Sequence, residues 1–439
     1  MFLAASACAG GGGTEPSGPP LVATSGDQQL GKANQRLGRP ITVRVADATG
    51  QSQSGVVVRW TAGENGTATP ASTTTDSLGL ASTVWTLGPA AGVQHLTASS
   101  IGYARIRFSA TAAAAETDGP IVVFPLLTPD GSGQTVHPDF VAMPAPWNAA
   151  PRYLVVTPYR NGSSVYEDPS LFTGDGAASW APPKGVENPI AKPESGYLSD
   201  PDAVYLPDQN LLRIYYRQVS AANIIQMIST TDGVHFTYPQ MVAAGANHTI
   251  VSPTVVRRSP TDWLMWAVNA NSGCTASSTT VELRRSTDGL TWSAPQTVSL
   301  TQRGYSVWHI DVQWIPSRNE YWAVYNVKTG GSCTTPALYL ATSPDGVTWK
   351  TYKSPVLARG AIHDFADVVY RSTFSYDPQD DVIDFWYSGA RYEKPNYVWR
   401  TAYQRRPRRI VFETIGAEPH KAKAVLAPRA GVPPLLDPP

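Results

Sequence analysis

The chain has little charge and no long apolar run, and these two absences exclude several classes of protein. Only 15% of its 439 residues are charged, and 34 Lys and Arg balance 34 Asp and Glu, so the formal net charge is zero. Basic residues gather only in the short segment 405–409, so we expect no nucleic-acid partner. No stretch approaches the roughly twenty apolar residues that a membrane-spanning helix needs. The sequence therefore predicts no transmembrane helix.

Cysteine is also scarce, with three residues in the whole chain. The first of them, Cys8, follows small residues and precedes four glycines, so residues 1–20 resemble the end of a bacterial lipoprotein signal and its flexible tether. The resemblance implies a lipid on Cys8 and removal of residues 1–7. It also implies an extracytoplasmic location, as a cell-envelope lipoprotein or a secreted protein.

What the sequence does contain is a repeated turn. Asp-Gly pairs flanked by Ser or Thr and by an aromatic residue occur at Asp175, Asp232, Asp288 and Asp345, at intervals of 57, 56 and 57 residues. Asp-Gly permits the positive φ angles of a tight turn, and repeats of this length indicate propeller blades or solenoid units. With 13 Trp, 20 Tyr, 36 Gly and 38 Pro, the composition favours strands and turns. We therefore expect an all-β protein of two or three domains.

Residues 21–113 alternate apolar and polar side chains between turn signals, which predicts a small β-sandwich. The segment resembles bacterial immunoglobulin-like (Big-1) domains of the invasin and intimin type. The resemblance is carried by Gly26–Gln29, Val45–Gly50, Thr74–Ala81 and Trp85–Gly88. It implies a spacer or adhesive arm, joined to the rest of the chain by a linker at 114–119.

Five similar units follow in residues 120–416, which predicts a five-bladed β-propeller. First strands are expected to begin near residues 137, 200, 252, 309 and 370, and second strands at 153–157, 212–217, 263–268, 321–326 and 383–387. The fifth unit lacks the Asp-Gly turn, and the strand at 121–124 is expected to close the ring. The Pro-rich residues 417–439 are expected to be disordered.

In a propeller, the starts of the first strands and the loops between second and third strands share one rim. Cys274 and Cys333 fall in equivalent loops of neighbouring blades, so we expect a disulfide between them. The same rule gathers polar residues on this rim, and the candidates for substrate binding are His137, Asp202, Arg217, His309, His363, Asp364, Arg371 and Arg391. No pair of residues has the spacing of metal ligands, so His309 and His363 are expected to be satisfied by hydrogen bonds, and no metal or other cofactor is predicted.

The acids at the heads of the inner strands resemble those of five-bladed glycoside hydrolases, especially families 43 and 32, which place three carboxylates in an axial pocket. The resemblance implies catalytic roles for Asp139 as base and Asp200 as orienting acid. The third blade has Ser252 where those families have the Glu proton donor. Glu167 or Asp311 would then have to donate the proton.

Three functions remain open at this point. The first is a glycosidase acting on a poly- or oligosaccharide, working as a monomer. The second is a non-catalytic adhesin that binds glycans, which Ser252 favours. A sialidase ranks last, because sialidases usually have six blades. Asp139, Asp202 and Asp311 have a structural alternative, since an Asp at the head of a strand often only binds neighbouring backbone amides.

Overall fold

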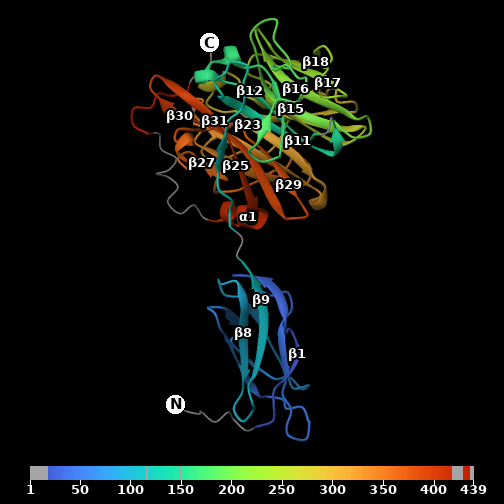
Figure 1. Cartoon of the computed structure of the whole chain (residues 1–439), viewed down its shortest axis with the longest axis vertical. Coiled ribbons are helices and arrows are strands. Elements are labelled where there is room, and N and C mark those ends of the chain that lie inside the picture. Colours follow the sequence, from blue (N-terminus) through green and yellow to red (C-terminus); the bar gives the residue numbers. More distant parts are fainter. Residues whose placement is uncertain (1–17, 115–116, 148–149, 330, 418–428, 436–439) are drawn as a thin grey trace, which may run out of the picture. The chain divides into compact units, whose positions relative to one another are not determined.

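The computed structural model describes residues 18–114, 117–147, 150–329, 331–417 and 429–435. The chain divides between Thr117 and Asp118 into two compact units (Figure 1). Regular structure is almost entirely β-strand, which confirms the predicted all-β class. No helix in the described ranges is both long and apolar enough to cross a membrane. Cys8 lies outside the described residues.

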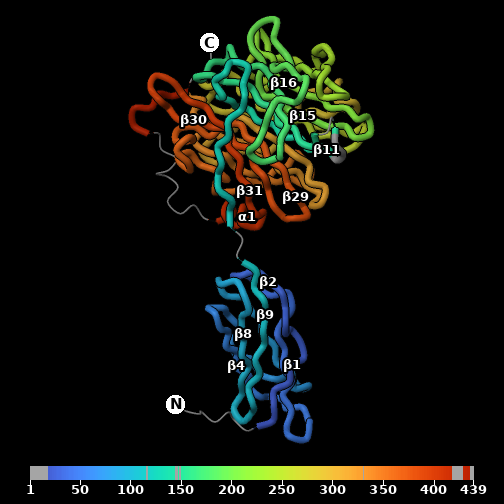
Figure 2. Tube along the Cα trace, in the orientation of Figure 1, coloured from blue at the N-terminus to red at the C-terminus, as the bar shows by residue number. Residues whose placement is uncertain are grey.

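The first unit is a sandwich of two sheets (Figure 2). On β7 and β9 every second residue is buried, which is the alternation visible in the sequence. Buried residues of both sheets, including Val43, Trp85, Leu96 and Phe108, share one core. The strand orders are β1 (Val22–Ser25), β3 (Ile41–Arg44), β7 (Leu80–Thr86), β5 (Thr67–Thr69), and β2 (Gln29–Lys32), β9 (Ile106–Ala113), β8 (Gly92–Ser99), β4 (Val57–Ala62), β6 (Ser72–Thr74).

The second unit contains five antiparallel sheets, which are the five predicted blades. In the first four blades the strands run in chain order from the inner strand outward. These blades are β11 (Thr135–Trp147), β12 (Ala150–Pro158), β13 (Ser170–Gly174), β14 (Trp180–Ala181); β15 (Tyr197–Leu206), β16 (Leu211–Val219), β17 (Asn223–Thr230), β18 (Gln240–Gly245); β19 (Val251–Ser259), β20 (Asp262–Asn269), β21 (Thr280–Ser286), β22 (Gln296–Thr297); and β23 (Ser306–Ile315), β24 (Glu320–Lys328), β25 (Ala337–Ser343), β26 (Lys350–Thr351) with β27 (Leu357–Ala358).

The fifth blade closes the ring. It consists of β28 (Val368–Val369), β29 (Thr373–Asp377), β30 (Val382–Glu393), β31 (Asn396–Pro407) and β10 (Val122–Phe124). β10 pairs with β31, so the early strand completes the last blade as predicted. The inner strands β11, β15, β19, β23 and β29 contact one another in succession, and β29 contacts β11. The inner strands therefore surround one central channel.

The Asp-Gly turns link the third and fourth strands of the first four blades and are structural, as predicted. In the fourth blade, Asp345 Oδ1 accepts the backbone N–H groups of Val347 and Thr348, at 2.8 and 2.7 Å. Gly346 has φ of 74°, which its lack of a Cβ permits, and its carbonyl accepts the indole N–H of Trp266 from the third blade at 2.8 Å. The turn thus ties two blades together.

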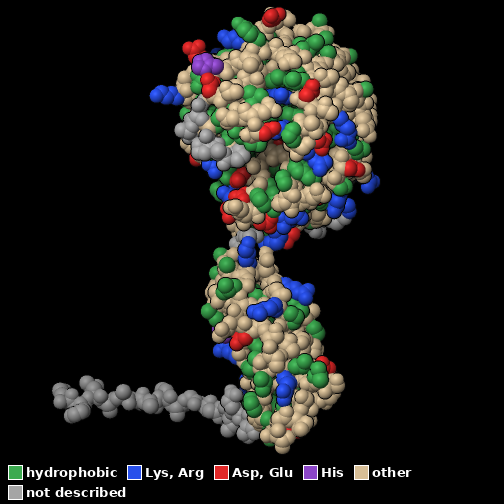
Figure 3. All heavy atoms as spheres, turned by 90° about the vertical axis from the view of Figure 1, so that its right-hand side faces the viewer, with side chains coloured by type: hydrophobic (Ala, Val, Ile, Leu, Met, Phe, Trp, Pro, Cys, Tyr) green, Lys and Arg blue, Asp and Glu red, His purple; other side chains and the backbone are tan. Residues whose placement is uncertain are grey.

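The remaining elements are short, and one helix and one irregular segment differ from what the sequence predicted. The helix α1 (Arg408–Gly416) was not predicted, and the segment 429–435, expected to be disordered, packs against the propeller. The 3₁₀ turns are η1 (Arg160–Gly162), η2 (Ser164–Tyr166), η3 (Gly273–Thr275), η4 (Pro316–Arg318) and η5 (His363–Phe365). On the face shown in Figure 3, basic and acidic side chains are interspersed, in keeping with the zero net charge.

The predicted disulfide is present. Cys274 lies in the loop after β20 and Cys333 in the loop after β24, and their Cα atoms are 4.8 Å apart. The bond joins positions that are 59 residues apart in the chain, and it ties together the rim loops of the third and fourth blades. It therefore constrains the unfolded chain as well as the rim.

Replacing Cys274 and Cys333 together by Ser is expected to lower the free energy of unfolding by about 2–4 kcal/mol, because the unfolded chain regains the freedom that the bond removes. Urea unfolding followed by tryptophan fluorescence measures the change. The matched control is Cys8→Ser, which leaves the bond in place. An unchanged unfolding midpoint in the double variant would contradict a stabilising bond.

Candidate functional site

Three inner strands share a local irregularity that positions the site. β11, β15 and β19 each shift register at a residue followed by proline, which is His137, Asp200 or Ser252. These three residues have φ values of 54°, 52° and 54°, which non-glycine residues rarely adopt. Bulges re-aim side chains, and backbone of this kind concentrates at functional sites. The repeated bulge therefore marks one end of the channel as the candidate site.

We call His137, Asp200 and His309 the histidine cluster. They come from β11, β15 and β23, so three blades meet at one point. Asp200 Oδ1 lies 3.4 Å from His137 Nε2 and 3.0 Å from His309 Nδ1. One potential ligand atom of each residue lies within 4.8 Å of the others. All three side chains are buried, and Asp200 is fully so.

The facing atoms of this cluster lack hydrogen-bond partners among the described residues. They are His137 Nε2, Asp200 Oδ1, and both ring nitrogens of His309. Buried polar atoms are normally satisfied, so their convergence indicates a ligand. A divalent ion held at about 2.0–2.2 Å places neighbouring ligand atoms about 3.0–3.5 Å apart. The two distances from Asp200 Oδ1 to the imidazoles, 3.4 and 3.0 Å, fit that spacing. Two imidazoles and one carboxylate suit a transition-metal ion such as zinc or iron.

Neighbouring groups orient the cluster. His137 Nδ1 lies 3.0 Å from Thr157 Oγ1, which leaves Nε2 facing Asp200. Asp200 Oδ2 accepts the backbone N–H of Ser252 at 3.3 Å and lies 3.3 Å from Arg217 Nε. Because these contacts engage Oδ2, Oδ1 is left to face the imidazoles. Supporting contacts of this kind are typical of metal ligands.

The charges in the cluster suit metal binding. Burial lowers the pKa of His137 well below its usual range, and it also lowers the pKa of His309. Burial acts to raise the pKa of Asp200, but the charges of His137, His309 and the guanidinium of Arg217 hold that pKa well below its usual range. Of these three groups only Arg217 stays charged at every ordinary pH, so it is the permanent counter-charge of Asp200. Neutral imidazoles and an ionised carboxylate are the forms that bind metal ions.

A cavity of about 40 Å³ opens beside the histidine cluster. Glu167, which follows η2, lines it, and its Oε2 lies 3.5 Å from His137 Nδ1 without a hydrogen-bond partner among the described residues. Burial, followed by repulsion from Asp200, raises the pKa of Glu167 well above its usual range. A buried carboxyl with a raised pKa facing a cavity is a candidate general base or acid.

Tyr370 forms another wall of this cavity. Its ring centroid lies 5.3 Å from that of His137 and 4.6 Å from that of His309. Its hydroxyl oxygen accepts the indole N–H of Trp308 at 3.4 Å, and burial raises its pKa well above the usual range. The phenol is therefore neutral and can donate its proton in a hydrogen bond to a substrate oxygen.

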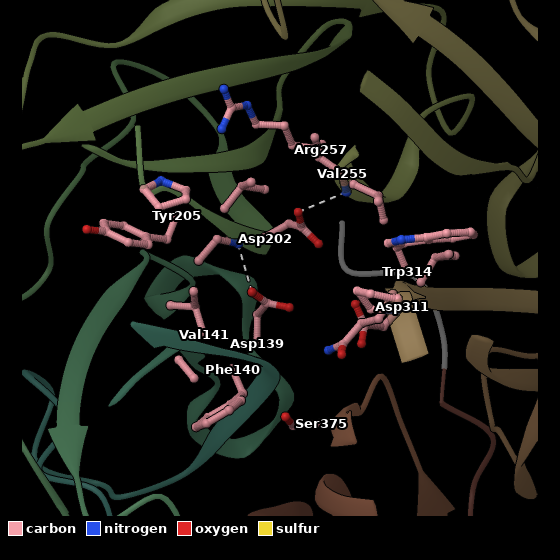
Figure 4. Close-up of a pocket in the computed structure, with 18 residues that line it drawn as sticks. Asp139, Phe140, Val141, Asp202, Tyr205, Val255, Arg257, Asp311, Trp314 and Ser375 are labelled. Carbon is pink, nitrogen blue, oxygen red and sulfur yellow. Dashed lines mark hydrogen bonds between the residues drawn. The ribbon is translucent and has the colours of Figure 1, made fainter. Parts of the chain in front are cut away.

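A second set of acids, which we call the aspartate cluster, lies farther along the same inner strands. Asp139, Asp202 and Asp311 come within 4.8 Å of one another and line a pocket of about 470 Å³ (Figure 4). Asp139 accepts the backbone N–H of Ala203 at 2.7 Å, and Asp202 accepts that of Val255 at 2.9 Å. These bonds join β11 to β15 and β15 to β19. Asp139 and Asp202 thus have the structural role that the sequence left open, in which an Asp at the head of a strand binds a neighbouring backbone amide.

Charge in the aspartate cluster is incompletely balanced. Burial and then the charge of Asp311 raise the pKa of Asp202 to about 7. Burial also raises the pKa of Asp139 well above its usual range, and that of Asp311 to a smaller extent. Arg371 Nη2 lies 3.8 Å from Asp202 Oδ1, and the guanidinium donates to the carbonyl of Pro201 at 2.6 Å. Arg371 therefore acts as the counter-ion of the aspartate cluster and is not part of the histidine cluster.

The structure thus divides the residues proposed from sequence. It brings together Asp200, Glu167, His137, His309 and Arg217 at the histidine cluster, and places Asp139, Asp202, Asp311 and Arg371 at the aspartate cluster. Among the other rim candidates, His363 Nε2 lies 2.8 Å from Arg391 Nη1, and Arg391 also pairs with Glu393. His363, Asp364 and Arg391 line neither of the two cavities.

Ser252 has a structural role. Its Oγ donates to the carbonyl of Ile310 at 3.0 Å and accepts the N–H of the same residue at 3.2 Å, which joins the third blade to the fourth. Its own N–H orients Asp200. A short hydroxyl residue makes these contacts in the place where the glycosidase families carry a proton donor.

Two features of the site did not follow from the sequence. His309 was expected to be satisfied by hydrogen bonds; its Nδ1 lies 3.0 Å from Asp200 Oδ1, whereas its Nε2 has no hydrogen-bond partner among the described residues. The sequence predicted no set of metal ligands, because the members of the histidine cluster are far apart in the sequence on separate blades. Tyr370 was missed entirely. The repeated residue-Pro motif at His137, Asp200 and Ser252 was the signal that could have identified the bulged positions.

Comparisons with known proteins agree with the fold. No family model matches the chain. A curated A type blood N-acetyl-alpha-D-galactosamine deacetylase from Flavonifractor plautii is 28% identical over 315 residues, which is 60% of this chain and 41% of that protein. The chain thus spans about two fifths of the length of the curated relative that it matches.

Solved structures give the same comparison. The crystal structure of an N-acetylgalactosamine deacetylase from F. plautii, in complex with blood group B trisaccharide, has 25% identity and a TM-score of 0.61, covering 69% of this chain and 99% of that chain. A GH62 hydrolase in complex with xylotriose has 13% identity and a TM-score of 0.49, covering 67% and 98% of the two chains. The curated relative and the first of these two structures are both, by name, deacetylases of N-acetylgalactosamine.

Proposed function

We propose that this chain is a metal-dependent hydrolase that removes the acetyl group from an N-acetylated amino sugar in a glycan. One observation carries the proposal: two imidazoles and a carboxylate with unsatisfied facing atoms converge next to the buried carboxyl of Glu167. The similarity to a deacetylase that acts on N-acetylgalactosamine supports the choice of bond.

His137, Asp200 and His309 would hold the metal ion. When bound there, a divalent ion supplies Lewis acidity, which polarises a carbonyl oxygen and lowers the pKa of water. Arg217 and the backbone N–H of Ser252 keep the carboxylate of Asp200 oriented and ionised. These contacts fix the carboxylate in advance, which is the preorganisation that catalysis by electrostatic stabilisation requires.

In its ionised form, Glu167 takes one proton from the attacking water, whose oxygen forms a bond to the acetyl carbonyl carbon. It then delivers that proton to the sugar nitrogen as the C–N bond breaks, so water and amide give acetate and a free amine. The neutral hydroxyl of Tyr370 donates a hydrogen bond to the oxygen on which negative charge develops. Trp308 fixes that hydroxyl by donating to its oxygen.

A glycoside hydrolase is the second candidate, because Asp200 and Glu167 are two carboxyl groups in one site. Such enzymes need an acid and a base on either side of a glycosidic bond. Asp139, the expected base, instead lies in the aspartate cluster and pins the next blade. The unsatisfied imidazoles have no role in that chemistry, so we rank it below deacetylation.

The disulfide supports our further proposal that the protein works outside the cytoplasm.

Metal removal tests the proposal. The full chain, incubated with an oligosaccharide ending in N-acetylgalactosamine, is expected to release acetate and leave a free amine. Dialysis against a chelator should abolish release, and adding back zinc, manganese or iron(II) one at a time should restore it with at least one ion. New reducing ends that form without acetate, and that persist with the chelator, would favour the glycosidase. Binding without either product would favour the adhesin.

A further inference from the structure

The segment 429–435 is attached to the propeller through a buried charge. The guanidinium of Arg429 contacts both carboxylate oxygens of Asp367, with Nε 2.7 Å from Oδ1. Asp367 is only 2% exposed, and its Oδ2 also accepts the N–H of Tyr392 at 2.8 Å. Without Arg429 a buried carboxylate would lose this partner, which is costly. The contact therefore anchors residues 429–435 to the propeller.

The other end of the segment is held by hydrogen bonds to the rim loop that carries the disulfide. The backbone N–H of Leu435 donates to Thr334 Oγ1 at 2.8 Å, and its carbonyl accepts the N–H of Cys333 at 2.9 Å. Between the two ends, the carbonyl of Pro433 accepts the hydroxyl of Tyr397 at 2.6 Å. The side chain of Leu435 is 8% exposed and joins the hydrophobic core that includes Trp308 and Tyr370.

The position of Leu435 reduces the space in the cavity at the candidate active site. Leu435 lines the cavity beside the histidine cluster, and that cavity measures about 40 Å³. One water takes about 30 Å³, whereas pockets for small organic ligands measure about 300–1,000 Å³. The cavity can therefore hold the attacking water but not an acetylated sugar. A neighbouring hollow of about 280 Å³ is formed by the rim on one side and by Arg429, Val432 and Pro433 of the segment on the other.

We propose that residues 429–435 are an autoinhibitory plug, and that the rim groove beneath them is the subsite for the part of the glycan next to the acetylated sugar. The groove offers the carboxylate of Asp367, the hydroxyls of Thr334 and Tyr397, and the N–H of Cys333. The plug engages all four, and the hydroxyl groups of a neutral oligosaccharide could engage the same groups. Plug and glycan therefore exclude each other. The inference rests on the proposed function for the role of the site.

Arg429→Glu in the full chain tests the plug, since it places a negative charge against Asp367. Hydrogen exchange at the amide of Cys333 is expected to quicken, because that N–H loses Leu435 as acceptor. Calorimetric titration with an oligosaccharide ending in N-acetylgalactosamine should show an affinity at least about tenfold higher than for the unchanged chain, if the plug is seated nine tenths of the time. A synthetic peptide of residues 429–435 should reverse both effects, which an unfolded variant could not show.

The matched control is Arg409→Glu, which reverses a charge in the exposed pair with Glu413 on α1 and should leave both readouts unchanged. Unchanged exchange or unchanged affinity in Arg429→Glu overturns the plug. Weaker affinity also overturns it, because the segment would then complete the binding site. If the variant binds glycan more tightly but neither chain releases acetate, the plug stands and deacetylation fails.

Discussion

Replacing Glu167 by Gln is expected to slow acetate release by about 10²–10⁴-fold, because an amide of the same shape cannot take a proton from water. The carboxyl is 3% exposed, lines the cavity and has an unsatisfied oxygen 3.5 Å from His137, so it is placed to act on a water held there. KM should change little, since the substitution preserves size. Steady-state kinetics with the acetylated oligosaccharide measures both quantities.

Metal content separates a proton-transfer role from a ligand role. Elemental analysis of Glu167→Gln should show the same metal-to-protein ratio as the unchanged chain, because the three proposed ligands are untouched. The matched control is Asp168→Asn, which removes a neighbouring carboxyl whose pKa burial raises to about 6, and which should retain activity. Activity within threefold of the unchanged chain in Glu167→Gln would remove this residue from the mechanism.

The architecture could be predicted because it repeats. The spacing of Asp175, Asp232, Asp288 and Asp345 gives a period of about 57 residues. Because each period contains the same pattern of strands and turns, a pattern that is weak in one blade is supported by the equivalent segments of the others. The closing strand and the disulfide followed from the same regularity. The helix α1 and the packing of residues 429–435 against the propeller each occur once, outside the repeats, so no repeated pattern could predict them.

The site was harder to predict because its geometry depends on local irregularity. His137 and Asp139 are two residues apart on one strand, yet they belong to different clusters, and a bulge with positive φ at His137 separates them. Hydrophobic alternation cannot reveal such a bulge. The metal-ligand set was missed for another reason: His137, Asp200 and His309 come from three blades, so no short motif contains two of them. Tyr370 was not predicted because a tyrosine at the start of a strand is more often part of a hydrophobic core than of a site.

The two clusters also explain why the resemblance to glycosidases was informative and yet incomplete. It identified inner-strand acids as the functional residues, and Asp200 does lie at the centre of the candidate site. It treated Asp139 as a partner of Asp200, whereas Asp139 accepts a backbone N–H from the next blade. The same blade architecture can thus place acids of one sequence pattern either at a reactive centre or at a structural joint.

Asp200→Asn is expected to lose the metal and, with it, about 10³-fold or more in acetate release, because a Lewis acid contributes several kcal/mol and each 1.36 kcal/mol is tenfold. Asp200 offers the only carboxylate of the histidine cluster, and Arg217 is positioned to pair with its charge. An Asn keeps the shape and one oxygen but no negative charge. Elemental analysis and acetate release together test this expectation.

Asp202→Asn is the matched control, since it changes the same residue type two positions later on the same strand. Its amide oxygen can still accept the N–H of Val255. The substitution also removes the negative charge that, after burial, raises the pKa of Asp139. We therefore expect this variant to keep its metal and its activity within about threefold, in line with a substitution outside the reacting centre. If both variants lost metal equally, the division into two clusters would be wrong. If Asp200→Asn kept its metal and lost only activity, Asp200 would act as an acid or base, and the glycosidase would become the better reading of the site.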